Sequence, residues 1–462
     1  MRAGQKKAWR DHATRWRCIC RGVLVACALV PVTMALGNAY GQSLGQVVET
    51  ALKTNPKVLA AAAQRQAVVH DLAQAQAGYF PTLDVNLADG KEDTVSPQVI
   101  ALGGTESYLI RREAGATLTQ KLYDGKATSS EIDRQRALLE AATHRLTEAR
   151  EQIALQAAGA YLDVLKNRNL VKLANDDIRA HLDILAKVRL RVEGGVSQKA
   201  DLQQALGRMA LAKSVASARA GKLRESEADY QTVVGNLPGT LADPVVKATP
   251  LATSGAVDTD LLTRAIQQDS ATALKSNPTL NAANADVSAA EAAVRGAKAP
   301  YLPRLNLEAN VSRDQNIAGI PGDFNTDSLM LVMHWNLFRG GADQAQERAY
   351  VQRKFAAMDT AASTRRDIEG RVAVALHAKA TSEERLGYLQ EHATLSADVL
   401  ESYQEQLDLG RRTLLDVLNA ENELFSARSD LAEGRYDDML NQYAVEAAQG
   451  LLVQSLGITS AN

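Results

Sequence analysis

The sequence predicts an α+β chain that is mainly α-helical, in which long antiparallel coiled-coil helices accompany two β-hairpins. Three observations carry this prediction: an internal sequence repeat, long helical stretches without proline, and segments in which apolar and polar residues alternate. Aromatic residues make up only 4% of the 462 residues, which is too few for a bulky globular core. The abundant alanine, leucine and glutamate favour long helices that pack closely through small side chains.

The segment 1–41 has the composition of a secretory signal peptide. Several Arg and Lys residues come first, an apolar run follows at 22–36, and small residues stand at Ala39 and Gly41. The alternatives are a membrane anchor, for which the apolar run is short, and a lipoprotein modified at Cys27. All three cysteines lie in this segment, so cleavage near Gly41 leaves an acidic chain without thiols.

The remaining chain contains two copies of one structural unit. Residues 51–56 (Ala-Leu-Lys-Thr-Asn-Pro) recur as residues 273–278 (Ala-Leu-Lys-Ser-Asn-Pro), and Tyr79 matches Tyr301 at the same offset. A repeat of this length predicts that both halves run through the same order of elements. The predicted boundaries are 42–238 for the first repeat, 239–258 for a proline-containing linker, 259–457 for the second repeat and 458–462 for a short tail.

Each repeat is expected to contain one very long helix that turns back at a glycine into a second helix. Ile132, Leu139, Leu146 and Ile153 fall at strict seven-residue spacing, which is typical of a coiled-coil seam. Such a helix cannot bury its apolar stripe alone, so an antiparallel partner is predicted. The predicted helices are 44–77, opened by Ser43, then 127–192 and 199–234 in the first repeat, and 342–409 and 413–456 in the second.

Four segments alternate with period two and are predicted to form one hairpin in each repeat. In the second repeat Leu305, Leu307 and Val311 alternate with polar residues such as Asn306 and Glu308. The apolar side chains therefore share one face of the predicted sheet and the polar ones share the other. Polar loops around 89–107 and 313–327 join the two strands of each hairpin.

The predicted strands, of about ten residues, have the length of tilted membrane strands, which is roughly 9 to 11 residues. Four strands cannot close a barrel, and lipid does not tolerate an open sheet edge. Three copies would supply twelve strands, with the apolar face toward lipid and the polar face toward a wet lumen. The alternative is a pair of amphipathic hairpins on a soluble helical body. Aromatic residues at the strand ends favour the membrane, as in interfacial girdles: Tyr79, Tyr123, Tyr301, Trp335 and Phe338.

Several motifs together resemble one known family. They are Asn55-Pro56 and Asn277-Pro278, residues 301–305, residues 335–341, and the glycine turn with its following helix at 409–420. In these residues the chain resembles the TolC family of outer-membrane channel proteins. The resemblance implies a homotrimer with a twelve-stranded barrel in the outer membrane and a long α-helical barrel across the periplasm. Residues 403–407 and the ending Gly457-Ile458 are similar to the branch that serves type I secretion of adhesins.

The resemblance also implies a gate at the periplasmic tip, where the two glycine turns lie. The turn glycines are Gly194, Gly195 and Gly410. An arginine and an acid of the family link the helices of the closed tip, and they match Arg412 and Asp201 by position. The acid that rings the pore matches Asp416.

Two positions depart from the family pattern, so fewer polar links and a weaker cation site are expected. A second ring acid is replaced by Asn419, and a tyrosine before the glycine is replaced by Leu407. An acid repeated around a threefold axis attracts cations. The alternative for Asp201 and Asp416 is an ordinary acid at a helix N-terminus, stabilised by the helix dipole.

No catalytic, metal or cofactor site is predicted, because the seven histidines are scattered without ligand spacing. No clustered basic surface predicts nucleic-acid binding. Energy for export would therefore come from an inner-membrane ABC exporter or proton-driven pump, joined through a periplasmic adaptor. The leading hypothesis is a passive outer-membrane duct for type I secretion of a protein. The alternatives are a duct for small-molecule efflux and a periplasmic coiled-coil scaffold without a pore.

Overall fold

The structure is a computed structural model that describes residues 41–101, 103, 107–244, 252–253, 256–257 and 259–458. The predicted signal peptide at 1–41, with the alternative of lipidation at Cys27, lies outside these residues apart from Gly41. The predicted tail at 458–462 lies outside them apart from Ile458.

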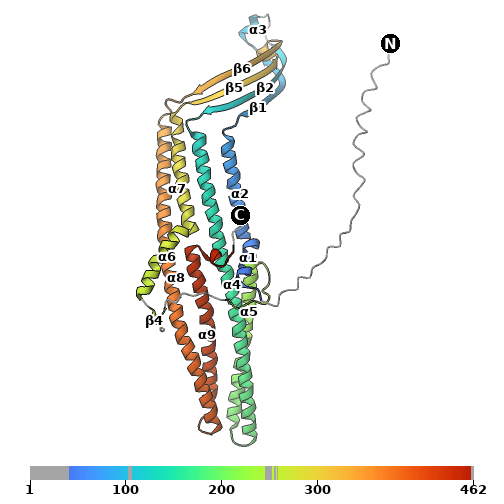
Figure 1. Ribbon diagram of the computed structural model, residues 1–462. Helices are drawn as coiled ribbons and strands as arrows, with labels where there is room; N and C mark the ends of the chain where they lie inside the picture. Colours follow the sequence, from blue (N-terminus) through green and yellow to red (C-terminus); the bar gives the residue numbers. More distant parts are fainter. Residues whose placement is uncertain are drawn as a thin grey trace, which may run out of the picture. The chain divides into compact units, whose positions relative to one another are not determined.

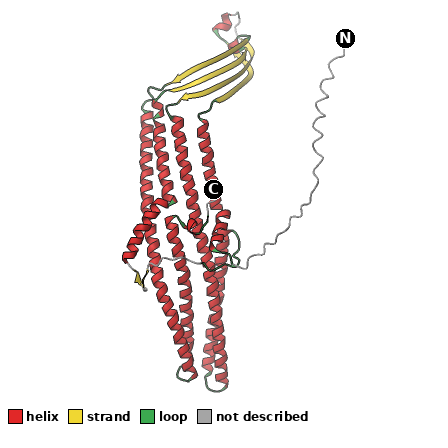
Figure 2. Cartoon of the chain, viewed as in Figure 1, coloured by secondary structure: helices red, strands yellow, loops and turns green. Residues whose placement is uncertain are grey.

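Long helices, a four-stranded sheet and a small two-stranded sheet make up the described chain, which confirms the predicted fold class (Figure 2). The helices are α1 (Leu44–Thr54), α2 (Pro56–Ala77), α3 (Pro97–Ala101), α4 (Ala127–Glu193), α5 (Lys199–Val234), α6 (Thr259–Ser276), α7 (Pro278–Ala297), α8 (Ala342–Asp408), α9 (Leu414–Gln449) and α10 (Leu452–Ser455). The strands are β1 (Thr82–Thr94), β2 (Ser107–Tyr123), β3 (Ala252–Thr253), β4 (Ala256–Val257), β5 (Arg304–Gln315) and β6 (Asp323–His334).

The helices α4 and α8 run from the sheet to the opposite end of the molecule (Figure 1). Each has 67 residues, so each is about 100 Å long. Beside the sheet, α4 packs against α2 and α7, and α7 packs against α8; farther away, α4 packs against α5 and α9, and α9 against α8. Of the heptad residues, Ile132 and Ile153 are buried, whereas Leu139 and Leu146 are only half-buried.

One predicted helix is in fact two. The helix expected at 44–77 breaks at Asn55, which ends α1 and caps α2. Pro56 cannot donate a backbone hydrogen bond, and it disfavours the helical conformation in the residue before it. The Asn55 side chain accepts from Lys57 N at 3.0 Å and donates to Val233 O at 3.0 Å, which satisfies a free carbonyl near the end of α5.

The second repeat contains the same break. Asn277 ends α6 and caps α7, accepting from Thr279 N at 2.9 Å and donating to Ala448 O at 3.0 Å. The shared Asn-Pro pair is therefore a clip that fastens the first helices of each repeat to the end of its returning helix.

The helix predicted at 413–456 also stops early. It ends at Gly450, whose φ of +74° is left-handed, and the short α10 follows. The buried Glu151 carboxylate accepts hydrogen bonds from the Leu452 and Val453 amides, at 2.9 and 3.1 Å. These bonds hold α10 against α4.

A large apolar cluster lies where α1, α10 and the ends of α5 and α9 meet the middle of α4. One of its tyrosines, Tyr161, is fully buried, and its hydroxyl group lies within hydrogen-bond reach of two carbonyl oxygens, that of Gln42 at 2.9 Å and that of Ala242. Burial raises the pKa of Tyr161 to about 12, so the phenol keeps its donor hydrogen. The predicted linker meets this region, because Leu241 pairs with Gln42 in an isolated bridge.

The sheet is antiparallel, with the order β1-β2-β5-β6, so the two hairpins lie side by side. The strands are longer than predicted: β2 has 17 residues and β1 has 13. The last strand ends at His334, so Trp335 lies directly beyond it. Polar residues of the predicted loops continue the two-residue alternation of the strands, and they extend the backbone pairing of the sheet.

Candidate functional site

One face of the sheet is apolar across all four strands. Directly opposite residues of antiparallel strands point to the same face, and the register pairs Leu83 with Leu118, Leu118 with Ala309, and Ala309 with Leu329. We call this set the apolar belt: Leu83, Val85, Leu87, Ala114, Ala116, Leu118, Leu305, Leu307, Ala309, Val311, Leu329, Leu331 and Met333.

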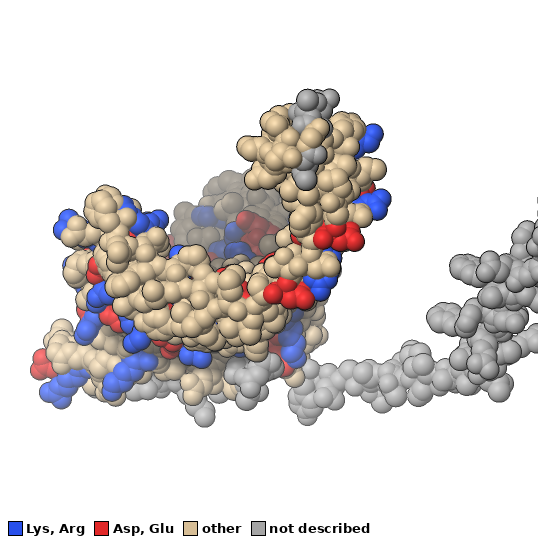
Figure 3. Space-filling view, turned by 90° about the horizontal axis from the view of Figure 1, so that it is seen from above, with Lys and Arg blue, Asp and Glu red and all other residues tan. Residues whose placement is uncertain are grey.

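Large side chains of the apolar belt are exposed. The accessible fraction of Leu87 is 78% and that of Leu329 is 71%. Seen from the sheet end, the curved layer is covered mostly by uncharged residues (Figure 3). A contiguous exposed apolar surface of this kind marks a contact with a membrane or with another protein.

Ion pairs bound the apolar belt at its far end, on the same face. Asp89 stands directly opposite Arg112, with Nε 3.1 Å from Oδ1, and Arg313 Nη1 lies 2.7 Å from Asp327 Oδ1. Asp89 follows Leu83, Val85 and Leu87 at the same two-residue spacing, so the sequence indicated that Asp89 shares their face. The predicted strand nevertheless ended before Asp89.

Aromatic residues lie at the other end, between the strands and the helices. The five predicted residues are all exposed: Tyr79, Tyr123, Tyr301, Trp335 and Phe338. The Trp335 indole donates to Tyr301 O at 3.2 Å, and the Tyr301 hydroxyl donates to a Glu347 carboxylate oxygen at 3.1 Å. Their polar atoms thus bond to neighbouring groups while the rings stay accessible.

Both edges of this sheet are open within the described chain. The edge strands β1 and β6 each pair with only one neighbour, β2 and β5 respectively. A long edge strand with free donors and acceptors is a template for pairing with another chain.

The two glycine turns have the same backbone geometry at the opposite end of the molecule, which we call the tip. Gly195 and Gly410 have φ angles of +72° and +70°, whereas Gly194 has an ordinary φ of −77°. In both turns the next amide donates a 2.8 Å bond to a carbonyl five residues back, Val196 to Arg191 and Arg411 to Gln406. This pattern closes a helix end through a left-handed residue.

Both predicted gate acids form local hydrogen bonds at the start of a helix. An oxygen of Asp201 accepts from the Gln198 amide, and an oxygen of Asp416 accepts from the Thr413 amide, each at 3.1 Å. The Thr413 hydroxyl also donates to Asp416 at 2.8 Å. These bonds lower the pKa of Asp416, with a smaller contribution from Arg412. Within one chain, both acids are therefore bonded as ordinary acids at a helix N-terminus, which was the alternative to the gate.

Arg412 folds back from the turn onto the end of α8. Its guanidinium lies 4.2 Å from the centre of the Tyr403 ring, and its Nε donates to the Gln406 side chain at 3.0 Å. In the described chain no hydrogen bond or ion pair joins Arg412 to Asp201. The side chain of Leu407 packs partly buried against the apolar core of the tip.

Near the tip, polar contacts join the two helical hairpins of one chain, which are the pair α4 and α5 and the pair α8 and α9. Sequence reasoning missed these contacts. An Arg208 nitrogen on α5 donates to Asn419 Oδ1 on α9 at 2.8 Å, and Arg191 on α4 donates to Leu407 O at 3.4 Å. No sequence signal could have found them, because they depend on how the hairpins pack.

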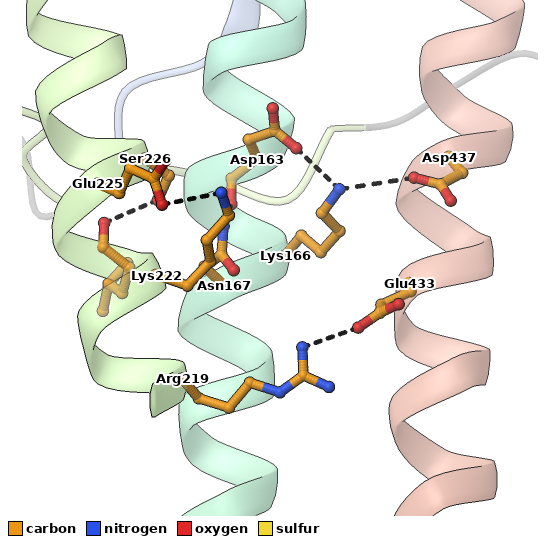
Figure 4. Close-up of polar contacts among 10 residues, drawn as sticks. Asp163, Lys166, Asn167, Arg219, Lys222, Glu225, Ser226, Glu433 and Asp437 are labelled. Carbon is orange, nitrogen blue, oxygen red and sulfur yellow. Dashed lines mark hydrogen bonds and ion pairs between the residues drawn. The ribbon is translucent and has the colours of Figure 1, made fainter. Parts of the chain in front are cut away.

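Two further ion pairs join the first hairpin to α9 farther from the tip (Figure 4). Lys166 on α4 lies 2.8 Å from Asp163 and 3.5 Å from Asp437, while Arg219 on α5 lies 2.9 Å from Glu433. Since these side chains are partly exposed, each pair stabilises the contact by at most about 1 kcal/mol.

None of the helices in the described ranges is apolar and long enough to cross a membrane. Within the same ranges no group of three His, Cys, Asp or Glu residues is placed to hold a metal ion.

Comparisons with known proteins agree on one family. The family model described as outer membrane efflux protein matches residues 47–236 and 270–451. The outer membrane efflux protein BepC of Brucella suis biovar 1 is 25% identical over 444 residues, which cover 95% of this chain and 92% of that protein. The proteases secretion protein PrtF of Dickeya chrysanthemi is 22% identical over 427 residues, which cover 88% of each.

A crystal structure of CusC has the same fold, with a TM-score of 0.74 at 17% identity over 88% of this chain and 91% of that one. The family model, the curved four-stranded sheet and the paired long helices all agree. The chain therefore belongs to the outer membrane efflux protein family and is an outer-membrane channel protein with a periplasmic tunnel.

Proposed function

We propose that three copies of this chain form a passive duct, with twelve strands closing a barrel in the outer membrane and the long helices forming its periplasmic wall. The single observation that carries the proposal is the exposed apolar belt on a sheet whose two edges are open. In lipid both edges must be paired. Pairing β1 of one copy with β6 of the next satisfies them and leaves the polar face toward the lumen.

The aromatic residues at the junction of strands and helices are proposed to lie at the periplasmic interface of the outer membrane. The rings of Tyr79, Tyr123, Tyr301, Trp335 and Phe338 are exposed there. Tyrosine and tryptophan favour this level because their rings are apolar and their polar atoms stay hydrogen-bonded.

The tip is proposed to be the gate. Three copies of Asp416 around the axis would form a ring of like charges that attracts cations, and the Thr413 hydrogen bonds that lower the Asp416 pKa favour the ionised form of each carboxyl group. Arg412 of one copy is proposed to reach Asp201 of the next when the tip is closed. Gly195 and Gly410, with Gly194 beside them, provide the turns that bring these groups together.

For the cargo, we propose a protein secreted by a type I system, driven by an inner-membrane ABC exporter through a periplasmic adaptor. This is supported by the similarity to the proteases secretion protein PrtF and by the motifs at 403–407 and 457–458. The second candidate is small-molecule efflux with a proton-driven pump, which the similarity to the outer membrane efflux protein BepC favours. Deletion of the gene tests the two: loss of a secreted protein supports the first, and drug sensitivity with unchanged secretion supports the second.

Planar-bilayer conductance distinguishes a duct from a scaffold without a pore. A purified trimer should conduct cations, and replacing Asp416 and Arg412 together should increase the conductance by opening the tip. A trimer that never conducts, even with both residues replaced, would rule out the duct.

A further inference from the structure

The loop that joins β5 to β6 is longer than the hairpin requires. The two strands stay in register up to Gln315 and Asp323. Beyond this pair, Asn316 N donates to Gly322 O at 2.9 Å and Gly322 N donates to Asn316 Oδ1 at 3.1 Å, so these two residues already close the hairpin. An Asn-Gly pair is sufficient for a two-residue turn between antiparallel strands. The residues between them, Ile-Ala-Gly-Ile-Pro at 317–321, are therefore surplus to the turn, and we call them the outer lid.

The outer lid packs against the first β-hairpin. Its 3-10 turn η2 (Ile317–Gly319) contacts both β1 and β2, and Gly319 is buried. A Cβ added to this glycine would lie 2.9 Å from Val99 Cγ2 and 3.0 and 3.2 Å from the Cβ atoms of Thr94 and Ser107. Val99, on the short helix α3 beyond the end of the sheet, is 4% exposed (Figure 1). A larger residue does not fit this contact without a shift, and the φ of +76° also favours glycine.

The backbone of the outer lid has a rarely populated conformation. Asn316 and Ala318 have φ angles of +56° and +54°, which alanine seldom adopts. Such residues persist only where the surrounding contacts hold them. One contact is at the base of the lid, where Asn316 Nδ2 donates to Ile110 O of β2 at 2.8 Å, and the other is the packing of Gly319. Loss of that packing therefore frees the lid to leave the first hairpin.

The outer lid lies on the polar face of the sheet, opposite to the apolar belt. Thr94 pairs with Ser107, and residues at two-residue spacing from this pair share its face, as do Asn86 and Gly115. Along β2 near the lid, the residues of this face are half-buried and those of the other face are exposed. The first set is Ser107, Leu109, Arg111 and Glu113, and the second is Tyr108, Ile110 and Arg112.

The wall beside the outer lid is charged, whereas the lid is not. Arg111 Nη1 lies 3.0 Å from Glu92 Oε2, and the same guanidinium pairs with Glu113. The Thr94 hydroxyl donates to Glu92 Oε1 at 2.9 Å. An apolar segment thus crosses the outer end of a face that otherwise suits water.

We propose that the outer lid is a second constriction of the duct, at its outer mouth. The proposal rests on the proposed duct, because the polar face becomes the wall of a lumen only in the closed barrel. Three copies would bring three uncharged segments toward the axis, and an apolar constriction opposes the passage of hydrated solutes. For a bulky solute to pass, the lid must lift away from Val99. The surplus length of the loop allows this without breaking the pairing of β5 with β6.

Deletion of residues 317–321 removes the outer lid and keeps the hairpin, because Asn316 then joins Gly322 in a two-residue turn that matches the twist of the strands. Ser312→Cys places a thiol on the polar face of β5, and the sequence has no cysteine after Cys27. Intact cells are treated from outside with a sulfonated maleimide, either small or attached to a long polyethylene glycol chain. The long reagent should label Ser312→Cys several-fold faster in the deletion variant, while the small one reacts equally in both.

Gly319→Leu tests the packing contact without shortening the chain. Its side chain cannot enter the space beside Val99, so it should displace the lid and also raise labelling by the long reagent several-fold. The matched control Gly90→Leu adds the same side chain to the polar face of β1, where nothing lies within 4 Å of the added Cβ. This control should keep the wild-type rate.

Leu331→Cys, on the apolar belt, verifies that the sheet is intact in each variant. Lipid should protect this thiol from the small reagent, which should react with Ser312→Cys.

The outcomes separate the two proposals. If the deletion or Gly319→Leu leaves labelling by the long reagent unchanged, or if that reagent is already as fast as the small one with the lid present, the constriction is wrong and the duct stands. If the small reagent fails to label Ser312→Cys, or labels Leu331→Cys equally well, the polar face is not the wall of a lumen and the duct itself is wrong.

Discussion

The two glycine turns at the tip share a backbone but differ in how the helix after each turn is anchored. Both have a left-handed glycine and an acid at the third helical position, Asp201 or Asp416. On α9 the next two residues, Val417 and Leu418, are 1% and 0% exposed. Their counterparts on α5 are the half-buried Leu202 and the exposed Gln203.

The packing order explains this difference. The helix α9 lies between α4 and α8, whereas α5 lies at an edge with α4 as its main neighbour. A helix between two neighbours needs apolar residues on two sides, while an edge helix needs them on one. The two repeats therefore share the backbone geometry of the turn. They differ in how deeply the helix after the turn is buried, because α5 and α9 occupy different positions in the packing.

The largest expected effect comes from breaking the anchor of α9. Leu418→Ala should cost about 2 to 5 kcal/mol of unfolding free energy, because it leaves a cavity in a fully buried site. Gln203→Ala, at the matching position of α5, should change it by less than about 0.5 kcal/mol. Urea unfolding followed by circular dichroism measures both. Equal effects would contradict the asymmetry between the two turns.

Changes of the turn glycines should affect both turns equally. Nothing lies within 4 Å of a Cβ added at Gly195 or Gly410, so substitution costs only the backbone strain of a positive φ. Gly195→Ala and Gly410→Ala should each lower the unfolding free energy by roughly 1 to 2 kcal/mol. As a control, Gly207→Ala in the interior of α5 also meets open space and should raise it by about 0.5 to 1 kcal/mol.

The cap residues should separate the turns again. Thr413 accepts a hydrogen bond from the Asp416 amide through its hydroxyl, so Thr413→Ala should cost about 1 kcal/mol. The side chain at the matching position, Gln198, is not a preferred N-cap, and Gln198→Ala should have a smaller effect. Thermal unfolding midpoints of the two variants check this, and a larger loss at Gln198 would argue against it.

The Asp416 cap should also give the tip a pH dependence. Because its pKa is lowered, the stability that Asp416 contributes is present above its ordinary value of 3.8 and is lost as pH falls through the lowered value. Asp416→Asn should remove this part of the acid dependence. Hydrogen exchange of the α9 amides between pH 5 and 3 measures it, and an unchanged dependence in the variant would assign it elsewhere.

Much of the fold was predictable because it depends on local rules. Ser43 caps α1, the glycines end α4 and α8 within a residue or two of the predicted positions, and α5 spans the predicted range 199–234. These features follow from side chains that bond to their own backbone or from periodic apolar patterns. The strands were predicted too short because the prediction followed apolar residues. Asp89 keeps the two-residue spacing, but its side chain is charged, so the apolar alternation ends there.

The rest depends on partners that are distant in sequence. The break at Asn55 is completed by Val233, 178 residues away, and the Arg208 contact with Asn419 spans 211 residues. A single sequence contains no pattern that indicates either of these long-range contacts. For the proposed gate, the positions were predicted by resemblance, but the partner of Arg412 within the chain, Tyr403, was not.

The smallest expected effect concerns that partner, and it asks what Arg412 does in the second turn that the first turn lacks. The matching residues of the first turn, Ser197 and Val188, include neither a cation nor an aromatic ring. An exposed cation over a ring contributes about 0.5 to 1 kcal/mol. If Tyr403 and Asp201 of the next copy compete for the Arg412 guanidinium, removing the ring leaves Arg412 for Asp201. Tyr403→Leu should then lower the open fraction in bilayers about two-fold to five-fold.

A double-mutant cycle decides this. Arg412→Ala should raise the open fraction, and in that background Tyr403→Leu should have no further effect, because the cation for which the two partners compete is gone. An effect of Tyr403→Leu that persists without Arg412 would mean that the ring acts through packing, and the second turn would then differ from the first only in the burial of α9.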